Sequence, residues 1–435
     1  MKIGVISLGC AKNLVDTENL LGILSASSQE IVTDYEEAEA IIINTCGFIE
    51  SAKTEAIDTI LSTADLKEGN LKKLIVMGCL STRYKEQLVE EMPEVDRFIS
   101  IREYSELGRI LSETLGVRIV NNYGKTQRIL SGKPWMAYLR IADGCDNRCS
   151  YCAIPLIRGD MHSVDEETLI AEAKRLIEGG VKELNLIAQD SSRYGYDLDG
   201  QLHLSGLLRK LDALEGVKWI RVLYLYPDEI PDDLIGTMKE CTHVLPYFDI
   251  PVQHGNNRLL KEMHRRGSRE LIIERCRRIR EELPEAVLRT TLITGFPGET
   301  EAEHEDTLSL MKEVRFDHLG AFTYSSEEDT PAYEMEDNVS PEVKERRLSE
   351  IMSLQAEISE ELLNERCGTV MEVLVESRDD LSRMYVGRSA MFAPDGVDGC
   401  VRFRSDRIYE AGDFAFVRIK RAAGHNLIGE AIDMQ

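Results

Sequence analysis

Three cysteines lie within eight residues of one another in the middle of the chain, and no other feature restricts the fold so strongly. Cys145, Cys149 and Cys152 are separated by three and then two residues, on a segment that Gly144 and Asn147 mark as a loop. Unrelated core cysteines rarely cluster on a turn, so the spacing predicts a metal site. Structural zinc usually has four protein ligands, whereas three thiolates suit an iron–sulfur cluster with one iron left open.

A second set of cysteines follows three apolar runs near the N-terminus. Each run reads as a strand, followed by a turn and a helix. The runs span residues 2–8, 40–45 and 73–78, and the cysteines that follow them are Cys10, Cys46 and Cys79. In an open parallel α/β sheet the carboxyl ends of neighbouring strands meet at one crevice, where ligands bind. These cysteines are therefore expected to form a second metal centre or, on residue chemistry alone, to be buried core residues.

The middle of the chain repeats a strand-plus-helix pattern six times. The strands are expected at 135–142, 183–188, 219–225, 247–252, 287–294 and 318–324, and the clearest helices at 165–178, 269–282 and 301–314. Six such units favour a partial (β/α)6 barrel over a complete eight-stranded one. Because barrel active sites lie at the carboxyl ends of the strands, the cysteine loop after the first strand is expected at the mouth.

The C-terminal part contains two further patterns, first a helical one and then one typical of short strands. Residues 341–366 form a charged amphipathic pattern that predicts a helix, and residues 369–435 consist of short alternating segments broken by Gly and Asp, which predict a small antiparallel β-barrel. The expected fold class is α/β, with an open parallel α/β domain first, then the partial barrel, then the small β-barrel. We place the domain boundaries at 1–120, 134–366 and 367–435, with a polar linker at 121–133.

Composition restricts the location and the partners of the protein. The 435-residue chain has no apolar run near the roughly 20 residues that span a bilayer and no signal-peptide pattern, which predicts a cytoplasmic protein with reduced thiols. Its net charge is −25. Such a surface repels phosphate backbones and attracts a basic protein partner, although acidity also serves solubility alone.

The central cysteine pattern, with Tyr151 directly before its third cysteine, resembles the signature of the radical S-adenosylmethionine (SAM) enzymes. The resemblance implies a [4Fe–4S] cluster on Cys145, Cys149 and Cys152, with SAM bound to the open iron. The C-terminal barrel resembles the TRAM module, which often binds RNA. Residues 369–435 carry 9 Lys and Arg against 11 Asp and Glu, which argues against RNA binding by this copy.

Taken together, the two cysteine sets and the terminal barrel resemble the methylthiotransferases over the whole chain. Some members modify adenosine in tRNA, and one branch modifies an aspartate of small-subunit ribosomal protein twelve. Three segments, 8–18, 224–228 and 249–254, are similar to the ribosomal-protein branch. The acidic chain also suits a basic ribosomal protein better than a polyanion. The resemblance therefore implies a sulfur-group transferase that adds a methylthio group to the aspartate β-carbon.

The family resemblance also implies the cofactors and the residues that hold them. Two [4Fe–4S] clusters are expected, one on each cysteine set, with SAM as both radical source and methyl donor and a separate electron donor as partner. The Cys145, Cys149 and Cys152 set would be catalytic and the Cys10, Cys46 and Cys79 set would hold the transferred sulfur. We expect both sets to open onto one cavity. The remaining SAM contacts are expected from Tyr151, Gln189, Asp190, Gln253 and Gly295.

Several residues allow simpler interpretations. Gln189 and Asp190 also fit a helix cap or a loop hydrogen bond, and Gly295 fits a tight turn before a helix. Arg158 is expected either to order the cysteine loop or bind a carboxylate, with a surface salt bridge as the favoured interpretation. Four other cysteines are expected to be structural: Cys241, Cys276, Cys367 and Cys400. The competing functions are a tRNA adenosine methylthiotransferase and a noncatalytic iron–sulfur electron carrier.

Overall fold

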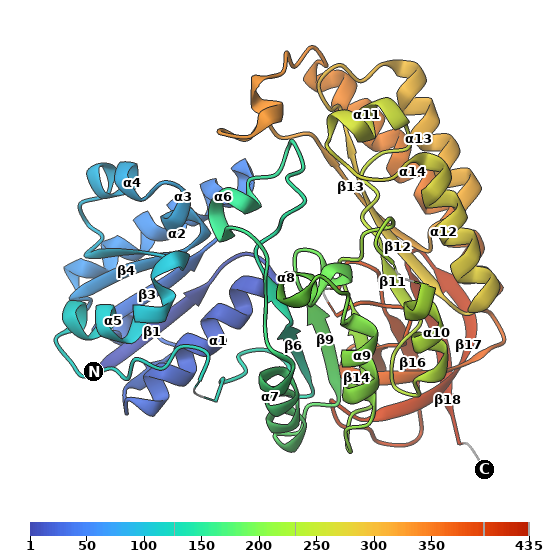
Figure 1. Cartoon of the computed structure of the whole chain (residues 1–435). Helices are drawn as coiled ribbons and strands as arrows, with labels where there is room; N and C mark the ends of the chain where they lie inside the picture. Colours follow the sequence, from blue (N-terminus) through green and yellow to red (C-terminus); the bar gives the residue numbers. More distant parts are fainter. Residues whose placement is uncertain (126, 231, 395, 434–435) are drawn as a thin grey trace. The chain divides into compact units, whose positions relative to one another are not determined.

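Figure 1 shows the chain as a computed structural model, which describes residues 1–125, 127–230, 232–394 and 396–433. The chain divides into two compact units. The first contains Met1–Gly179, Ile187–Gln189 and Ser325–Tyr333, and the second contains Gly180–Leu186, Asp190–Tyr324 and Glu334–Gln435. The expected domain boundaries remain predictions. The expected linker includes Thr126 and the expected terminal barrel includes residues 395, 434 and 435, all outside the described residues.

The first unit is built on a five-stranded sheet, drawn in blue to cyan in Figure 1. Its strand order is β2-β1-β3-β4-β5, and every neighbouring pair is parallel. The strands are β1 (Lys2–Ser7), β2 (Glu30–Val32), β3 (Ala40–Thr45), β4 (Lys73–Gly78) and β5 (Arg97–Ser100). The central strand β3 is buried along its whole length, as expected for an apolar strand covered on both faces.

Helices cover both faces of this sheet. On one face, Leu20 of α1 and Leu107 of α5 pack with Ile42 of β3. On the other face, Ile60 of α2 and Leu88 of α4 join a separate core. The helices are α1 (Ala11–Ala26), α2 (Glu50–Ala64), α3 (Cys79–Arg83), α4 (Lys85–Glu91) and α5 (Leu107–Leu115). The prediction of an open parallel α/β domain is therefore confirmed.

The first unit continues beyond the sheet into the cysteine loop. It adds β6 (Met136–Arg140), β7 (Ala142–Asp143), α6 (Ile154–Arg158), β8 (His162–Ser163) and α7 (Glu166–Glu178). The expected linker packs on α1, because the Ile129 amide donates to the Glu18 carbonyl at 3.2 Å and the Ser131 amide donates to the Glu18 carboxylate at 3.2 Å. The side chain of Arg128 is buried there. This segment is therefore part of the folded unit.

The second unit contains the remaining strands of the predicted partial barrel. The strands β9 and β10 pair in parallel, as do β11, β12 and β13. Their bounds are β9 (Glu183–Ile187), β10 (Trp219–Val222), β11 (Tyr247–Asp249), β12 (Val287–Thr294) and β13 (His318–Thr323). The helices are α8 (Tyr196–Asp199), α9 (Leu204–Asp212), α10 (Asp232–Glu240), α11 (Asn257–Glu262), α12 (Arg269–Glu282), α13 (Glu301–Val314) and α14 (Pro341–Glu365). All six predicted strands are present, because β6 is the first of them.

The C-terminal strands form a closed barrel in the order β14-β15-β16-β18-β17. Their bounds are β14 (Val370–Asp379), β15 (Met384–Arg388), β16 (Val401–Arg404), β17 (Phe414–Ala423) and β18 (Asn426–Ile432). Four of the five pairs are antiparallel, but β16 and β18 pair in parallel. The expected small antiparallel barrel is therefore present with one parallel pair, in which β18, antiparallel to β17, runs in the same direction as β16. Within the described residues, no helix is long and apolar enough to cross a membrane.

Candidate metal centres

The three N-terminal cysteines follow adjacent strands of one sheet. Cys10 comes after β1, Cys46 directly follows β3, and Cys79 directly follows β4. The loops approach closely, since a Cβ added at Gly9 would lie 2.8 Å from the Cβ of Cys46. Cys46 and Cys79 are buried and Cys10 is exposed. The sheet order therefore brings together three thiols that are far apart in sequence, as the strand pattern predicted.

Burial sets the protonation of these thiols. Burial raises the pKa of the Cys46 thiol and raises that of Cys79 to about 12, although the Arg158 guanidinium opposes both effects. Both thiols are therefore neutral at pH 7 until a metal displaces their protons. Across the described residues, no three His, Cys, Asp or Glu side chains lie close enough together to hold a single metal ion. The ligand set is sulfur alone, which fits an iron–sulfur cluster better than a hard cation.

The second set of cysteines lies on the loop between β7 and α6. Cys145 and Cys149 are buried, and Cys152 is partly buried. The loop is held at both ends, since the Cys145 amide donates to the Gly159 carbonyl at 3.1 Å and the Cys152 amide donates to the Cys149 carbonyl at 3.1 Å. Tyr151 is half-buried between the last two cysteines. The three cysteines thus lie on one loop that these backbone hydrogen bonds order before α6.

A network of buried charges connects the two cysteine sets within the first unit. Arg158, at the end of α6, contacts Asp16 of α1 at 2.9 Å and Asp143, just before the cysteine loop, at 2.8 Å. Arg140 contacts the same two carboxylates at 2.5 and 3.4 Å. Burial opposes ionisation of Asp143, but the two guanidinium groups outweigh it and lower its pKa. Its carboxylate therefore stays charged.

Arg158 corrects one sequence-based expectation. A surface salt bridge was the favoured interpretation, but the Arg158 side chain is only 2% exposed and its partner Asp16 only 1%. The alternative, that Arg158 binds a carboxylate and orders the loop, matches the contacts. Its ion pairs are formed with residues up to 142 positions away in sequence, so the local segment gives no indication that the side chain is buried.

The cysteine loop itself supplies a testable feature at Gly144. This residue has φ +76°, and an added Cβ would lie 2.0 Å from the Asp160 carbonyl oxygen. Gly144→Ala is therefore expected to displace the loop and to cost about 1–3 kcal/mol of stability. Iron bound by the Cys145, Cys149 and Cys152 set should fall with it, as measured by iron content and the visible absorption spectrum.

Gly132→Ala is the matched control, because an added Cβ there meets nothing within 4 Å. It should retain wild-type iron content and thermal stability. Equal iron content in the two variants would contradict the steric argument at Gly144.

The other expected SAM contacts are divided between the two units. In the first unit, the Gln189 side chain donates to the Asp143 carboxylate at 3.1 Å and so lies beside the start of the cysteine loop. In the second unit, Asp190 caps the 3-10 helix Ser191–Arg193 and accepts from the Ser192 amide at 3.1 Å. Gln189 therefore forms a loop hydrogen bond and Asp190 caps a short helix, which are the simpler interpretations of these two residues.

Gln253 and Gly295 both have left-handed backbone conformations at the ends of strands. Gln253 has φ +71° and forms an isolated parallel bridge with Leu292 of β12. Its side-chain Oε1 is buried and has no hydrogen-bond partner among the described residues. Gly295 has φ +73°, and an added Cβ would lie 2.3 Å from the Cγ of Lys344. The chain therefore needs glycine at 295 for the turn that leaves β12, and this agrees with the tight-turn interpretation.

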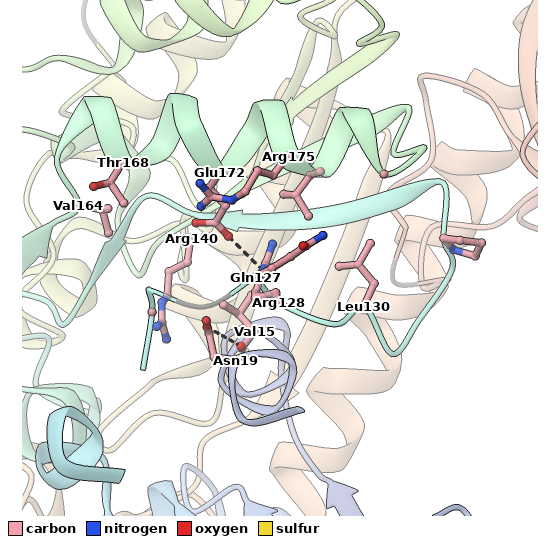
Figure 2. Close-up of a pocket in the computed structure, with 14 residues that line it drawn as sticks. Val15, Asn19, Gln127, Arg128, Leu130, Arg140, Val164, Thr168, Glu172 and Arg175 are labelled. Carbon is pink, nitrogen blue, oxygen red and sulfur yellow. Dashed lines mark hydrogen bonds and ion pairs between the residues drawn. The ribbon is translucent and has the colours of Figure 1, made fainter. Parts of the chain in front are cut away.

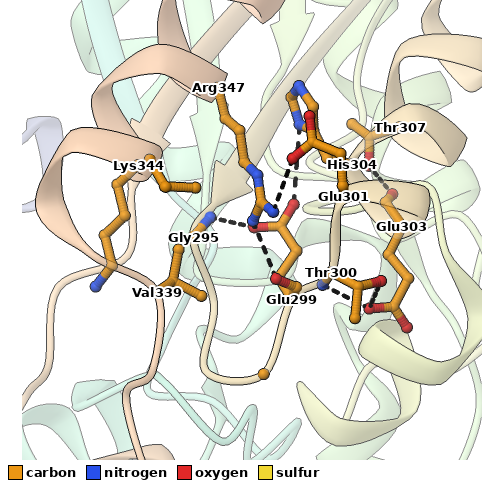
Figure 3. Close-up of polar contacts among 12 residues, drawn as sticks. Gly295, Glu299, Thr300, Glu301, Glu303, His304, Thr307, Val339, Lys344 and Arg347 are labelled. Carbon is orange, nitrogen blue, oxygen red and sulfur yellow. Dashed lines mark hydrogen bonds and ion pairs between the residues drawn. The ribbon is translucent and has the colours of Figure 1, made fainter.

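A buried carboxylate fixes the turn at Gly295, as Figure 3 shows. The Glu299 carboxylate accepts from the Gly295 amide and from Arg347 at 3.1 Å. It also accepts from His254 Nε2 at 3.2 Å. Burial opposes ionisation of Glu299, but His254 and Arg347 outweigh it and lower its pKa. Arg347 of α14 also contacts Glu301 at 3.2 Å. A charged cluster thus holds the turn between β12 and α13.

Two of the three segments that indicated the ribosomal-protein branch lie side by side in the second unit. The Leu225 amide donates to the Asp249 carbonyl at 2.7 Å, and the Tyr224 amide donates to the Asp249 carboxylate at 3.0 Å. Tyr224 has φ +63°. Segments 224–228 and 249–254 therefore form one structure at the carboxyl ends of β10 and β11, the edge where barrel enzymes bind their ligands.

The first unit also contains a cavity of about 340 Å³, shown in Figure 2. Arg128 and Glu172 pair in its wall, with the Arg128 Nε 3.1 Å from the carboxylate. Arg140 lines the same cavity and also contacts Asp16, so the cavity borders the charged network between the cysteine sets.

Sequence reasoning missed most of that network. Asn13 and Asp16 lie in segment 8–18, which indicated the ribosomal-protein branch, but the sequence predicted no role for either side chain. One signal was present: four consecutive polar or charged residues, Asp16 to Asn19, follow the apolar Leu14 and Val15 in a helix that packs on a core. The buried polar residues of α1 are Lys12, Asn13, Asp16, Thr17, Glu18 and Asn19. Buried polar side chains need partners and often mark functional sites.

Comparison with known families covers most of the chain. Residues 2–100 match the model described as "Uncharacterized protein family UPF0004", residues 139–311 match the radical SAM superfamily, and residues 367–432 match the TRAM domain. The radical SAM superfamily implies SAM and a [4Fe–4S] cluster. These matches and the observed elements together confirm the expected fold class, including the partial barrel and the TRAM-like barrel.

Solved structures support the same fold. The radical SAM methyltransferase TsrM from Kitasatospora setae, with cobalamin and a [4Fe-4S] cluster bound, superimposes with a TM-score of 0.55 at 11% identity, over 76% of this chain and 73% of that chain. The cobalamin-dependent SAM radical enzyme OxsB, with aqua-cobalamin and SAM bound, gives 0.53 at 13% identity, over 81% and 56%. At this level of identity the similarity concerns the fold alone.

Full-length relatives identify the family. A protein of Clostridioides difficile (strain 630) named "Ribosomal protein uS12 methylthiotransferase RimO" is 44% identical over 441 residues, covering 99% of both chains. A protein of the same name from Natranaerobius thermophilus is 45% identical over 440 residues, again covering 99% of both. The chain therefore belongs to the RimO family of radical SAM methylthiotransferases.

Proposed function

We propose that this methylthiotransferase adds a methylthio group to the β-carbon of an aspartate in ribosomal protein uS12. The observation that carries the proposal is the presence of two cysteine sets in one compact unit, tied together by buried charges. A noncatalytic electron carrier would not need the strand ends and turns of a SAM-binding barrel. Family membership supports the same choice, since relatives of this name match along the full chain.

Each cysteine set is proposed to hold one [4Fe–4S] cluster. Cys145, Cys149 and Cys152 would hold the cluster that binds SAM, and Cys10, Cys46 and Cys79 would hold the second. When bound, the first cluster would supply the electron that cleaves SAM to a carbon radical, the second would supply the sulfur, and SAM would supply the transferred methyl group. The protein would present the thiols, exclude water from the buried ones and accept electrons from a separate donor. That both sets open onto one cavity stays a prediction.

The remaining SAM contacts are proposed from residues at strand ends. Gln189 lies beside Asp143. The buried Oε1 of Gln253, which has no hydrogen-bond partner in the part of the chain that the structure describes, would accept from a hydroxyl or amine of the ligand. Gly295 is proposed to contact the adenine ring from the fixed turn after β12. Tyr151 and Asp190 complete the proposed set, Tyr151 from the cysteine loop and Asp190 from the turn after β9.

The chemistry of the surface supports a basic protein as substrate. The chain carries 77 acidic against 52 basic residues, so a polycationic ribosomal protein is attracted and RNA is repelled. The two branch-specific segments at the ends of β10 and β11 are proposed to take part in choosing this substrate. We also propose a cytoplasmic location, and domain boundaries at 1–120, 134–366 and 367–435 with the linker at 121–133.

The deciding experiment is mass spectrometry of uS12 from cells with and without this enzyme. The aspartate should carry a methylthio group only when the enzyme is present, and its tandem mass spectrum should place the group on the β-carbon. Modified adenosine in tRNA together with unmodified uS12 would favour the tRNA alternative. Purified, reconstituted protein that forms no 5′-deoxyadenosine from SAM and reductant would favour the electron carrier.

A further inference from the structure

Arg158 lies where three segments of the first unit meet. Its guanidinium contacts the Asp16 carboxylate at 2.9 Å, the Asp143 carboxylate at 2.8 Å and the Asn13 side-chain oxygen at 3.0 Å. Asp16 and Asn13 belong to α1, which follows Cys10, and Asp143 lies two residues before Cys145. Arg158 itself lies six residues after Cys152. One buried cation therefore touches the chain on both sides of the cysteine loop and the helix that follows the first N-terminal cysteine.

Asn13 extends this contact to all three N-terminal cysteine loops. Its side-chain amide donates to the Leu8 carbonyl at 3.1 Å, just before Cys10, and to the Thr45 carbonyl at 3.0 Å, just before Cys46. Its side-chain oxygen accepts from the Cys79 thiol at 3.5 Å and from Arg158. A single side chain thus connects the three loops, and Arg158 holds its oxygen in place.

The charge of Arg158 acts on the same thiols. A guanidinium stays protonated in proteins, so Arg158 is a permanent cation. It donates to the Asn13 side-chain oxygen at 3.0 Å, and the same oxygen accepts from the Cys79 thiol at 3.5 Å, so the cation lies one side chain away from a cysteine of this set. An iron–sulfur cluster on thiolates is anionic and gains a further negative charge on reduction, so a nearby buried cation favours its reduced state.

We propose that Arg158 is a positioning residue shared by both cysteine sets, which fixes the N-terminal loops through Asn13 and raises the reduction potential of the iron–sulfur cluster that they hold. This inference rests on the proposed function, because it needs a cluster on Cys10, Cys46 and Cys79. It assigns to one residue two separable effects, one on cluster retention through contacts and one on the potential through charge.

The test uses the full chain with Cys145, Cys149 and Cys152 replaced by alanine, so that only the N-terminal cluster is present. In this background Arg158→Gln should weaken cluster retention about 10- to 100-fold against a chelator. The cluster that remains should have a more negative midpoint potential in a redox titration followed by electron paramagnetic resonance. Arg158→Lys keeps the charge but not the forked contacts, so its potential should stay near that of the background and its retention should fall.

Arg102→Gln is the matched control. Arg102 is exposed and donates to the Leu156 carbonyl of the same helix α6 at 3.0 Å, but it does not contact Asp16, Asp143 or Asn13. It should change neither retention nor potential. Unchanged potential in Arg158→Gln, or equal shifts in Arg158→Gln and Arg158→Lys, would overturn the proposed role of the charge. If the background protein itself binds no cluster, the proposed second cluster fails instead, and the two failures are distinguishable.

Discussion

Cys79→Ser is expected to abolish methylthio transfer, with a loss of at least about 100-fold, while SAM is still cleaved to 5′-deoxyadenosine. The reason is that Cys79 belongs to one cysteine set only, and the Cys145, Cys149 and Cys152 loop has its own backbone hydrogen bonds. Serine replaces the sulfur ligand with a hydroxyl, which binds iron poorly. Iron should fall from about eight to about four per chain. Iron analysis, product chromatography and mass spectrometry of uS12 together measure these outcomes.

Cys276→Ser controls for the burial of a hydroxyl. Cys276 lies in α12, is as buried as Cys79, and has its pKa raised to about 12 by the same cause, burial. It belongs to neither cysteine set, so its replacement should leave iron content and transfer intact. If Cys276→Ser lost iron to the same extent, the effect of Cys79→Ser would reflect folding. Full transfer activity in Cys79→Ser would refute the assignment of Cys79 as a ligand.

Local sequence patterns predicted the elements that hold the cysteines. The apolar runs before Cys10, Cys46 and Cys79 became β1, β3 and β4, which are neighbours in the sheet. The bounds of β12, α12 and α13 were predicted correctly at both ends, because helix-capping residues such as Ser268 and Thr300 and chain breakers such as Pro284 and Gly295 flank these segments. Patterns of this kind depend on neighbours a few residues apart, and a single sequence contains that information.

Contacts between distant residues were not predictable in this way. The Arg158 and Asp16 pair spans 142 positions, and nothing near either residue indicates the other. The parallel pairing of β16 with β18 was missed for the same reason, since strand direction within a closed barrel depends on topology. The buried polar residues on α1 carried a signal, but a sequence does not show that a helix is covered on its polar face. Ion pairs between residues so far apart in sequence can be recognised only from the three-dimensional structure.

A second long-range ion pair carries the largest expected effect on stability. Glu183, the first residue of β9, is fully buried and contacts Arg388 of the terminal barrel at 2.6 Å and Arg221 of β10 at 3.4 Å. Glu183→Gln preserves the shape of the side chain but removes the carboxylate charge that faces two buried guanidinium groups, of which Arg388 keeps its pair with Glu376. The free energy of unfolding of the second unit should fall by about 3–5 kcal/mol at pH 7, as measured by chemical denaturation followed by tryptophan fluorescence.

The pH dependence of this loss has a definite sign. Burial opposes ionisation of Glu183, but Arg388 and Arg221 outweigh it and lower its pKa below the ordinary value. A carboxylate with a lowered pKa in the folded state stabilises the protein above its unfolded pKa, and this contribution is lost as the pH falls through the folded value. The stability difference between wild type and Glu183→Gln should therefore shrink in acid. Glu376→Gln, which removes a more exposed partner of the same Arg388, should cost less at pH 7. A larger loss for Glu376→Gln than for Glu183→Gln would show that burial of the carboxylate does not determine the effect.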